Sequence, residues 1–167
     1  MKNRPLKKTI FMKIMFLFCI LQGCLLAQAQ STNALDVFKS FKGSWTITSA
    51  GKKFPLKMTY DLASKNSVVT EYFGKELSVF YLDGDRLLMT HYCNAGNHPR
   101  LKLVKSGDPK NFEFEMIDIT NVKDETKEAH VQSISYRIMA QDELGLRIVW
   151  RQGKQEKTES YVLTKDQ

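Results

Sequence analysis

Cysteine is scarce in this sequence of 167 residues, which contains three. Two of them, Cys19 and Cys24, lie in an apolar segment near the N-terminus, and Cys93 stands alone in the rest of the chain. A single thiol cannot form an internal disulfide, so a disulfide-rich scaffold is excluded for that part of the chain. Residues 30–167 are numerous enough to fold around a hydrophobic core of their own.

The sequence also lacks an apolar run of the roughly 20 residues that a transmembrane helix needs. Its strongly apolar segment, IMFLFCILQGCLL, is shorter, and small residues follow it at Ala27 and Ala29. Five basic residues precede it, namely Lys2, Arg4, Lys7, Lys8 and Lys13. This order predicts a secretory signal peptide over residues 1–29. The mature chain would then begin at Gln30 and reside in the periplasm or outside the cell.

A lipid anchor is the alternative interpretation of the same segment. The tetrapeptide LQGC, ending at Cys24, has the leucine and glycine of a lipobox, in which the cysteine is acylated. Gln22 is unusual at its position, and the residues after Cys24 are apolar rather than a polar tether. The sequence therefore favours a soluble exported chain over an anchored one.

An excess of positive charge in the mature chain is likewise missing. The formal net charge is +7, and removing the five positive charges of the predicted signal peptide leaves +2. Most of the excess positive charge thus lies in the predicted signal peptide, and we expect no nucleic acid as a partner. The chain has no internal repeat, low-complexity tract or linker, so residues 30–167 are predicted to form one domain.

Hydrophobic residues alternate with polar ones along most of the chain after Gly43. FPLKMTYD, for example, places Phe54, Leu56, Met58 and Tyr60 on one face of a predicted strand. Ten strands are predicted in this way, over residues 44–49, 54–61, 67–74, 77–83, 86–93, 101–105, 112–118, 130–139, 144–152 and 157–164.

Other parts of the sequence predict how these strands are connected. Turn sequences such as DGD at residues 83–85 separate the strands, and apolar residues spaced by three over residues 31–42 predict a short N-terminal helix. We therefore expect an all-β fold, a single antiparallel up-and-down β-barrel, because closure leaves no exposed strand edge.

The segment FKGSW, with Gly43 and Trp45 at the start of the first strand, resembles the opening of lipocalins and fatty-acid-binding proteins. The resemblance implies that Trp45 closes one end of the barrel, with Arg147 or Arg151 packed across its ring. The stretch YLDGDRLLMTHYC with GNHPR also resembles a family of uncharacterised exported bacterial proteins with lipocalin-like (calycin-type) barrels. That second likeness implies no particular activity.

The segment THYCNAGNHPR, residues 90–100, contains two of the three histidines and Cys93. Strand alternation places His91 and Cys93 on the inner face with Leu87 and Met89. The same reasoning extends two further apolar rows. Asp118 is predicted to continue the row of Phe112, Phe114 and Met116, and His130 with Gln132 to continue the row of Ile134, Tyr136 and Ile138. These polar residues are expected to meet at one rim of the barrel.

Three functions fit such a cluster, beside a purely structural pairing of His91 with Asp118. The preferred one is binding of a small, partly hydrophobic molecule in the lumen, with no cofactor and with the oligomeric state left open. Its cavity would be lined by Phe54, Met58, Phe80, Phe112, Phe114, Tyr136 and Trp150. Its predicted ligand-binding residues are His91, Cys93, Asp118, His130, Gln132, Tyr136 and Trp150.

The alternatives are a metal or haem site and a barrel enzyme. His91, Cys93, Asp118 and His130 are all competent metal ligands, but His-x-Cys on a strand is not a specific metal signature. Cys93 with a histidine and Asp118 has the residue types of a thiol nucleophile with its base. The sequence contains no nucleophile elbow, phosphate-binding loop or metalloprotease motif, and it assigns no catalytic residue.

Overall fold

The computed structural model describes residues 34–104 and 108–167. The predicted signal peptide and the alternative anchor at Cys24 lie outside the described residues. The described chain forms ten strands: β1 (Gly43–Ser49), β2 (Lys52–Ala63), β3 (Val68–Phe73), β4 (Glu76–Asp83), β5 (Arg86–Tyr92), β6 (His98–Val104), β7 (Asn111–Thr120), β8 (His130–Ala140), β9 (Glu143–Gln152) and β10 (Gln155–Lys165). A short helix spans residues 34–40.

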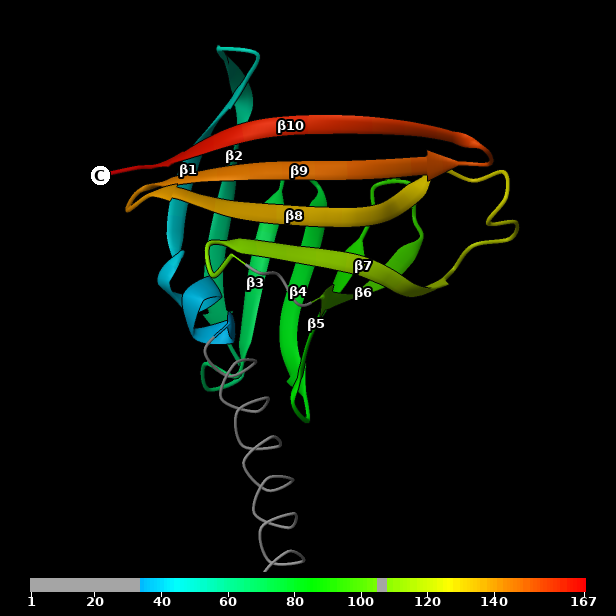
Figure 1. Ribbon diagram of the computed structural model, residues 1–167, viewed down its shortest axis with the longest axis horizontal. Helices are drawn as coiled ribbons and strands as arrows, with labels where there is room; N and C mark the ends of the chain where they lie inside the picture. Colours follow the sequence, from blue (N-terminus) through cyan, green and yellow to red (C-terminus); the bar gives the residue numbers. More distant parts are fainter. Residues whose placement is uncertain (1–33, 105–107) are drawn as a thin grey trace, which may run out of the picture.

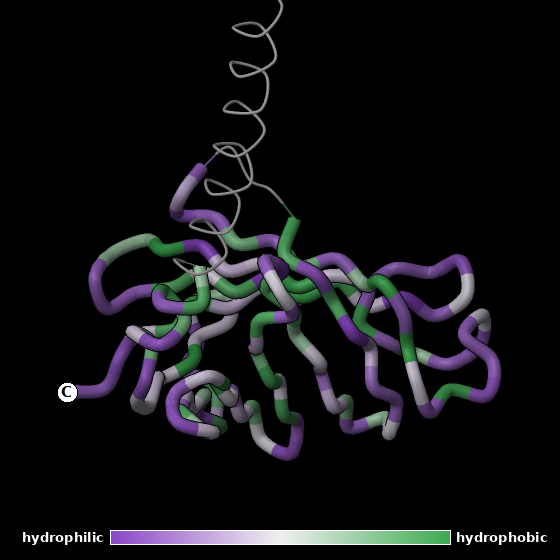
Figure 2. Tube along the Cα trace, turned by 90° about the horizontal axis from the view of Figure 1, so that it is seen from below, coloured by the Kyte–Doolittle hydropathy of each residue, from purple (hydrophilic) through white to green (hydrophobic). Residues whose placement is uncertain are grey.

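The ten strands form one closed antiparallel barrel, which confirms the predicted fold class (Figure 1). Each strand pairs with the next along the chain, and β1 closes the ring by pairing with β10. Hydrophobic and hydrophilic residues alternate along the strands, and the connecting loops are mostly hydrophilic (Figure 2). Alternation is what a sheet with one buried and one solvated face requires.

The N-terminal helix closes one end of the barrel. Its predicted apolar face is buried, with Leu35 at 3%, Phe38 at 0% and Phe41 at 5% exposure. The ring of Phe38 stacks on Phe80 at 4.5 Å between centroids and makes edge contacts at 5.2 Å with Tyr136. It also contacts Phe112 and Phe114. The space predicted to be a ligand cavity among these rings is therefore filled by Phe38.

Trp45 lies at the same end, where the resemblance had placed it. Its Nε1 donates a hydrogen bond of 2.7 Å to the carbonyl oxygen of Phe41, which fixes the helix to β1. The cation over its ring is Lys165, at 5.5 Å from the centroid, and not Arg147 or Arg151. Gly43 has a φ of +126°, a conformation that residues with a Cβ rarely adopt, so the turn into β1 requires glycine.

A β-bulge in the pairing of β1 with β2 changes the predicted alternation at one position. The register shifts between Thr46 and Thr48, and Leu56 on β2 is 45% exposed, although alternation had placed it with Met58 on the inner face. Between these paired residues β2 has three residues and β1 has one, so Leu56 lies in the irregular segment, whereas Phe54 remains partly buried. Among the residues that the structure describes, no helix has the length and apolar character needed to cross a bilayer.

Candidate functional site

The barrel end opposite the helix carries the candidate site, and we call it the mouth. It is formed by the connections β1–β2, β3–β4, β5–β6, β7–β8 and β9–β10, because alternate hairpins of an antiparallel barrel lie at the same end. His91 lies near the end of β5 and Glu76 at the start of β4, so both reach this end. Cys93 follows directly after β5.

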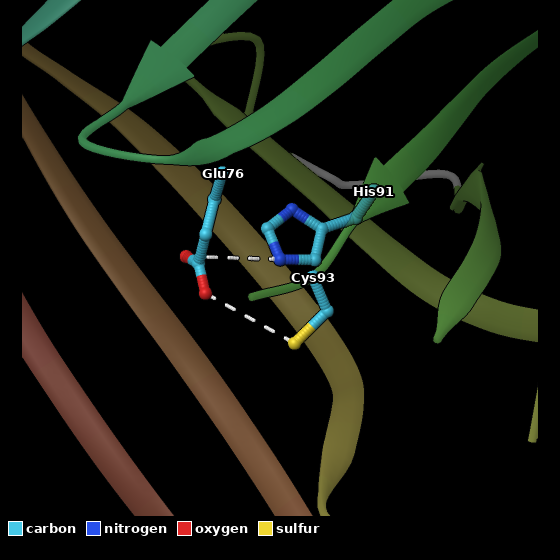
Figure 3. Close-up of side chains that lie close together, drawn as sticks. All are labelled: Glu76, His91 and Cys93. Carbon is cyan, nitrogen blue, oxygen red and sulfur yellow. Dashed lines mark hydrogen bonds and ion pairs between the residues drawn. The ribbon is translucent and has the colours of Figure 1, made fainter. Parts of the chain in front are cut away.

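Glu76, His91 and Cys93 form a compact group that we call the mouth cluster (Figure 3). One potential ligand atom from each residue lies within 4.8 Å of the other two. The closest approaches join Nε2 of His91 to Oε2 of Glu76 at 3.9 Å and Sγ of Cys93 to Oε1 of Glu76 at 4.0 Å. The Glu76 side chain is 17% exposed and that of His91 is 5% exposed, so the cluster lies at the boundary between core and solvent.

His91 is a neutral imidazole. Burial lowers its pKa to about 4, because the charged ring would lose its hydration. The 3.9 Å approach to Glu76 is therefore not an ion pair at neutral pH. Nδ1 shares a hydrogen bond of 3.1 Å with Oγ of Ser78, and the ring makes an edge contact with Trp150 at 6.3 Å. Nε2 is buried and has no hydrogen-bond partner among the described residues.

A buried carboxyl group lies behind Ser78. Glu71 on β3 is 4% exposed and accepts a hydrogen bond of 2.8 Å from the hydroxyl of Tyr136. Burial raises the pKa of Glu71, whereas hydrogen bonds from Tyr60, Tyr136 and Ser78 act against that shift. Burial and the nearby carboxyl group raise the pKa values of both tyrosines well above the usual range. The tyrosines therefore remain protonated donors.

The hydroxyl of Ser78 can donate or accept, so its hydrogen bond with Nδ1 is compatible with either tautomer of His91. When Nδ1 carries the proton, Ser78 accepts it and Nε2 presents a lone pair to the mouth. The buried Glu71 lies behind Ser78 in this network.

Cys93 is a buried thiol held in a tight turn. It is 7% exposed, and its backbone N–H and C=O bond to Asn97 and Gly96 at 3.0 and 2.8 Å. Gly96 has a φ of +90°, a conformation that favours glycine. The backbone N–H of Ala95 donates to Sγ at 3.4 Å. Burial raises the pKa of the thiol, which is opposite to the shift that an activated cysteine nucleophile needs.

The loop between β7 and β8 fastens this turn. Nδ2 of Asn97 donates to the carbonyl of Ala129 at 2.9 Å, and Nδ2 of Asn121 donates to the carbonyl of Gly96 at 2.6 Å. Two loops that are distant in sequence therefore support each other at the mouth. The position of Cys93 is set by both of them.

Asp118 does not belong to the mouth cluster, and its predicted inward orientation is wrong. The pairing of β6 with β7 shifts between Arg100 and Leu101, so Ile117 is an extra residue in β7. Beyond this bulge the alternation reverses, and Asp118 pairs with Arg100 on the outer face in a salt bridge. Both side chains are nearly half exposed, at 44% and 46%.

His130 and Gln132 are also displaced by a bulge. The register of β8 against β9 shifts between Val131 and Ser133, so that Val131 faces inward opposite Trp150. His130 is fully buried on the other face, where its Nδ1 bonds to the carbonyl oxygen of Glu128 at 2.9 Å. Gln132 is the extra residue of the bulge. The predicted meeting of His130 with His91 is therefore wrong.

Aromatic side chains form an apolar wall at the mouth. Phe54, Phe73 and Tyr161 come from β2, β3 and β10, are partly buried, and lie 5.6 to 5.9 Å apart between ring centroids. Trp150 on β9 contacts His91 and donates a hydrogen bond of 3.2 Å from Nε1 to Glu159. The mouth thus combines apolar rings with the polar atoms of the mouth cluster.

A hollow of about 360 Å³ opens beside Trp150. It lies between Ala129 of the β7–β8 loop and the β9–β10 hairpin, with Lys157 and Glu159 in its wall. Burial alone would raise the pKa of Glu159, but hydrogen bonds from Lys157, Tyr161 and Trp150 outweigh it and lower the pKa. The hollow therefore contains a lysine ammonium group and a carboxylate beside an indole ring.

The sequence interpretation placed His91, Cys93 and Trp150 correctly near one another but missed Glu71, Glu76 and Ser78. A signal for them was present in the alternation. Glu71 stands in the same row as Val69 and Phe73, and Ser78 alternates with Phe80. A charged or hydroxyl residue in phase with buried apolar residues indicates an inward polar group.

No protein-family model matches the chain, and no curated protein matches it either. The closed antiparallel barrel of ten strands is compatible in shape with a calycin-like fold. The likeness to lipocalins therefore concerns the form of the barrel, and the site has to be interpreted from its own geometry.

Proposed function

We propose that this protein is an exported β-barrel that binds a small amphipathic molecule at its mouth. The observation that carries the proposal is the pairing, at one end of the barrel, of an apolar aromatic wall with a buried polar cluster. Binding sites for small molecules are mostly apolar and contain a few placed polar groups. The hollow of about 360 Å³ adjoins this site through Trp150 and Glu159, and its lining does not include the mouth cluster.

The two parts of the ligand would occupy different sides of the mouth. Its apolar part would pack against Phe73, Tyr161 and Trp150, which are all partly buried and retain surface for contact. Its polar part would reach the mouth cluster, where Nε2 of His91 has no hydrogen-bond partner among the described residues. Occupation of the mouth by a group that satisfies this buried nitrogen, directly or through a bound ion, would favour binding.

The proposed site lies at the mouth of the barrel and not in the deep lumen, where the sequence analysis had predicted it. Phe38 fills the lumen at the helix end, and Tyr136 there is fully buried against Phe38 and Glu71. A thiol-based enzyme is not favoured, because burial raises the pKa of Cys93. The proposal of export rests on the basic, apolar and small-residue order of the first 29 residues, with cleavage after Ala29.

The proposal can be tested with a fluorescent anilinonaphthalene sulfonate, an amphipathic probe that has one apolar and one anionic part. Phe73→Ser should weaken binding of the probe about tenfold or more. A tenfold loss of affinity corresponds to about 1.4 kcal/mol, which is less than the free energy gained by burying a whole Phe side chain. Tyr72→Ser is the matched control, since Tyr72 is the adjacent residue and is 47% exposed on the outer face. The measurement is a fluorescence titration of each folded variant.

Two results would contradict the proposal. One is the failure of the wild-type protein to bind any amphipathic probe of this kind. The other is an equal loss of affinity in Phe73→Ser and Tyr72→Ser, which would place the probe elsewhere on the surface. Trp150→Ala provides a second variant, because Trp150 lines the hollow and contacts His91.

A further inference from the structure

We infer that the mouth cluster of Glu76, His91 and Cys93 is a binding site for a divalent transition-metal ion of the zinc type. This inference rests on the proposed function, since it assigns the polar half of the same mouth. It goes beyond that function by naming the chemical group to which the ligand would attach. The three residues offer one carboxylate oxygen, one imidazole nitrogen and one sulfur (Figure 3).

The geometry of the three donor atoms is close to that of a coordinated ion. Bonds of 2.0 to 2.3 Å at tetrahedral angles place donor atoms about 3.3 to 3.7 Å apart. The donors here lie within 4.8 Å of one another, with two separations of 3.9 and 4.0 Å. A movement of about 1 Å therefore closes the site, and a rotation of the partly exposed Glu76 side chain can supply it.

The unpartnered nitrogen of His91 is an independent indication of a ligand. Nε2 is buried and has no hydrogen-bond partner among the described residues. Leaving a buried polar atom unpaired costs about 1–3 kcal/mol. Nε2 lies beside the carboxylate of Glu76 and the sulfur of Cys93. In the tautomer with the proton on Nδ1, one cation would satisfy all three groups.

The hydrogen-bond network behind His91 is the type of support that metal-binding histidines have. A ligating histidine usually donates its second ring N–H to a fixed acceptor, which sets the tautomer and the ring orientation. Here Nδ1 shares a hydrogen bond of 3.1 Å with Oγ of Ser78, which accepts when Nδ1 carries the proton, and the buried Glu71 lies behind Ser78. A role in packing alone would not require Nε2 to be free.

The donor set favours zinc over harder cations. Thiolate and imidazole ligands suit Zn²⁺ and related ions, whereas Mg²⁺ and Ca²⁺ prefer oxygen ligands throughout. Three protein ligands leave a fourth position, as in zinc sites that hold a water or a substrate group. As the bond to Sγ forms, the thiol proton of Cys93 passes to solvent. The fourth position would accept the polar group of the proposed amphipathic ligand.

Titration with Co²⁺, which takes the same tetrahedral ligand sets as Zn²⁺ and absorbs light, tests the inference. The metal-free wild-type protein should bind one Co²⁺ per chain and show a thiolate-to-cobalt charge-transfer band. Cys93→Ser should lose that band, and His91→Ala should bind at least about tenfold more weakly. Asp118→Asn is the control and should behave as wild type, because Asp118 faces outward against Arg100.

A second measurement uses the wild-type protein alone, so it does not depend on the folding of variants. Stoichiometric Zn²⁺ should slow alkylation of Cys93 about tenfold or more, because the coordinated sulfur is no longer a free nucleophile. Absence of Co²⁺ binding, a charge-transfer band that persists in Cys93→Ser, or alkylation that is indifferent to Zn²⁺ would each overturn the inference.

Failure of this inference is distinguishable from failure of the proposed function. If the naphthalene sulfonate binds at the mouth and Phe73→Ser weakens it while Co²⁺ does not bind, the amphipathic site stands and the metal site is refuted. If Co²⁺ binds as expected and the probe does not, the metal site stands and the apolar half of the proposal is refuted.

Discussion

Ser78 holds His91 in the orientation that both proposals require. In Ser78→Ala the Nδ1 group loses its partner at 3.1 Å and Glu71 loses one of its donors. We expect the free energy of unfolding to fall by about 1–3 kcal/mol and the affinity for Zn²⁺ to fall about 10- to 100-fold. Urea denaturation and competition with a chromophoric chelator measure the two effects.

Ser135→Ala is the control for this prediction, because Ser135 lies on the outer face of β8 between Ile134 and Tyr136. It should change neither quantity appreciably. A Ser78→Ala variant with wild-type stability and affinity for Zn²⁺ would show that the hydrogen bond with Ser78 is not needed to orient His91.

The buried carboxyl group of Glu71 should make stability depend on pH. Its folded-state pKa is raised above the ordinary value of 4.5, so the native state retains a proton that the unfolded state has lost. The stability that it contributes is complete below the unfolded-state pKa and is lost as pH rises through the folded-state pKa. Glu71→Gln cannot ionise, so its stability should decline less between about pH 4.5 and pH 7.

Urea midpoints across this pH range test the prediction, with Glu113→Gln as the control because Glu113 is exposed on β7. A residual decline is expected in Glu71→Gln, since burial also raises the pKa of Glu76. Identical pH profiles for wild type and Glu71→Gln would contradict the assignment of a raised pKa to Glu71.

At the scale of single residues, the sequence predicted part of the site. The inward orientation of His91 followed from its alternation with Leu87 and Met89, and the structure bears it out. Glu76 was missed because the predicted strand began one residue later, at Leu77, which left the carboxylate in a turn. Hydrogen-bond partners such as Ser78 depend on which strands are neighbours, and alternation within one strand does not contain that information.

Among the elements, the N-terminal helix contributes most to the core at the end opposite the mouth. Phe38 is fully buried and contacts five other aromatic rings. Phe38→Ala should lower the free energy of unfolding by about 3–5 kcal/mol, because it removes buried contacts and leaves a cavity. Urea denaturation checks this, and the variant should retain the mouth cluster if it remains folded.

Leu56→Ala is a suitable control for Phe38→Ala, because Leu56 is an apolar residue that is 45% exposed. Its effect should stay within about 0.5 kcal/mol, as for most surface substitutions. A loss from Phe38→Ala as small as that of the control would show that the helix is not part of the core.

The strands show where prediction from alternation succeeds and where it ends. Every predicted strand corresponds to an observed one, since hydrophobic period two is the strongest signal of a half-buried sheet. The errors at Leu56, Asp118 and Gln132 lie beside β-bulges. A bulge arises from pairing with a neighbouring strand, so the sequence of one strand does not reveal it.

For the whole molecule, the proposal of export predicts a defined mature N-terminus. Protein recovered from the extracytoplasmic fraction of its own host should begin at Gln30, after cleavage behind Ala29. Intact-mass analysis with N-terminal sequencing measures this directly. A chain that begins at Cys24 and carries acyl groups would show the lipid-anchored alternative, and an uncleaved chain would contradict export.

At the same scale, the two ends of the barrel differ in what fills them, and the proposed binding site lies at only one of them. The helix end is packed with aromatic rings, and the mouth gathers Glu76, His91 and Cys93 beside partly buried aromatic residues. Pairing between neighbouring strands connects the two ends, so the filled end gives the mouth a rigid frame. Binding groups set on rigid strands are held more precisely than groups on loops.

Native mass spectrometry of the protein, purified from its own host without an affinity tag, tests most directly whether the mouth is a binding site organised by His91. The wild-type protein should carry added mass from an ion, a small molecule or both, and a folded His91→Ala variant prepared in parallel should carry less of it. A bare wild-type chain, or the same added mass on both proteins, would contradict the account.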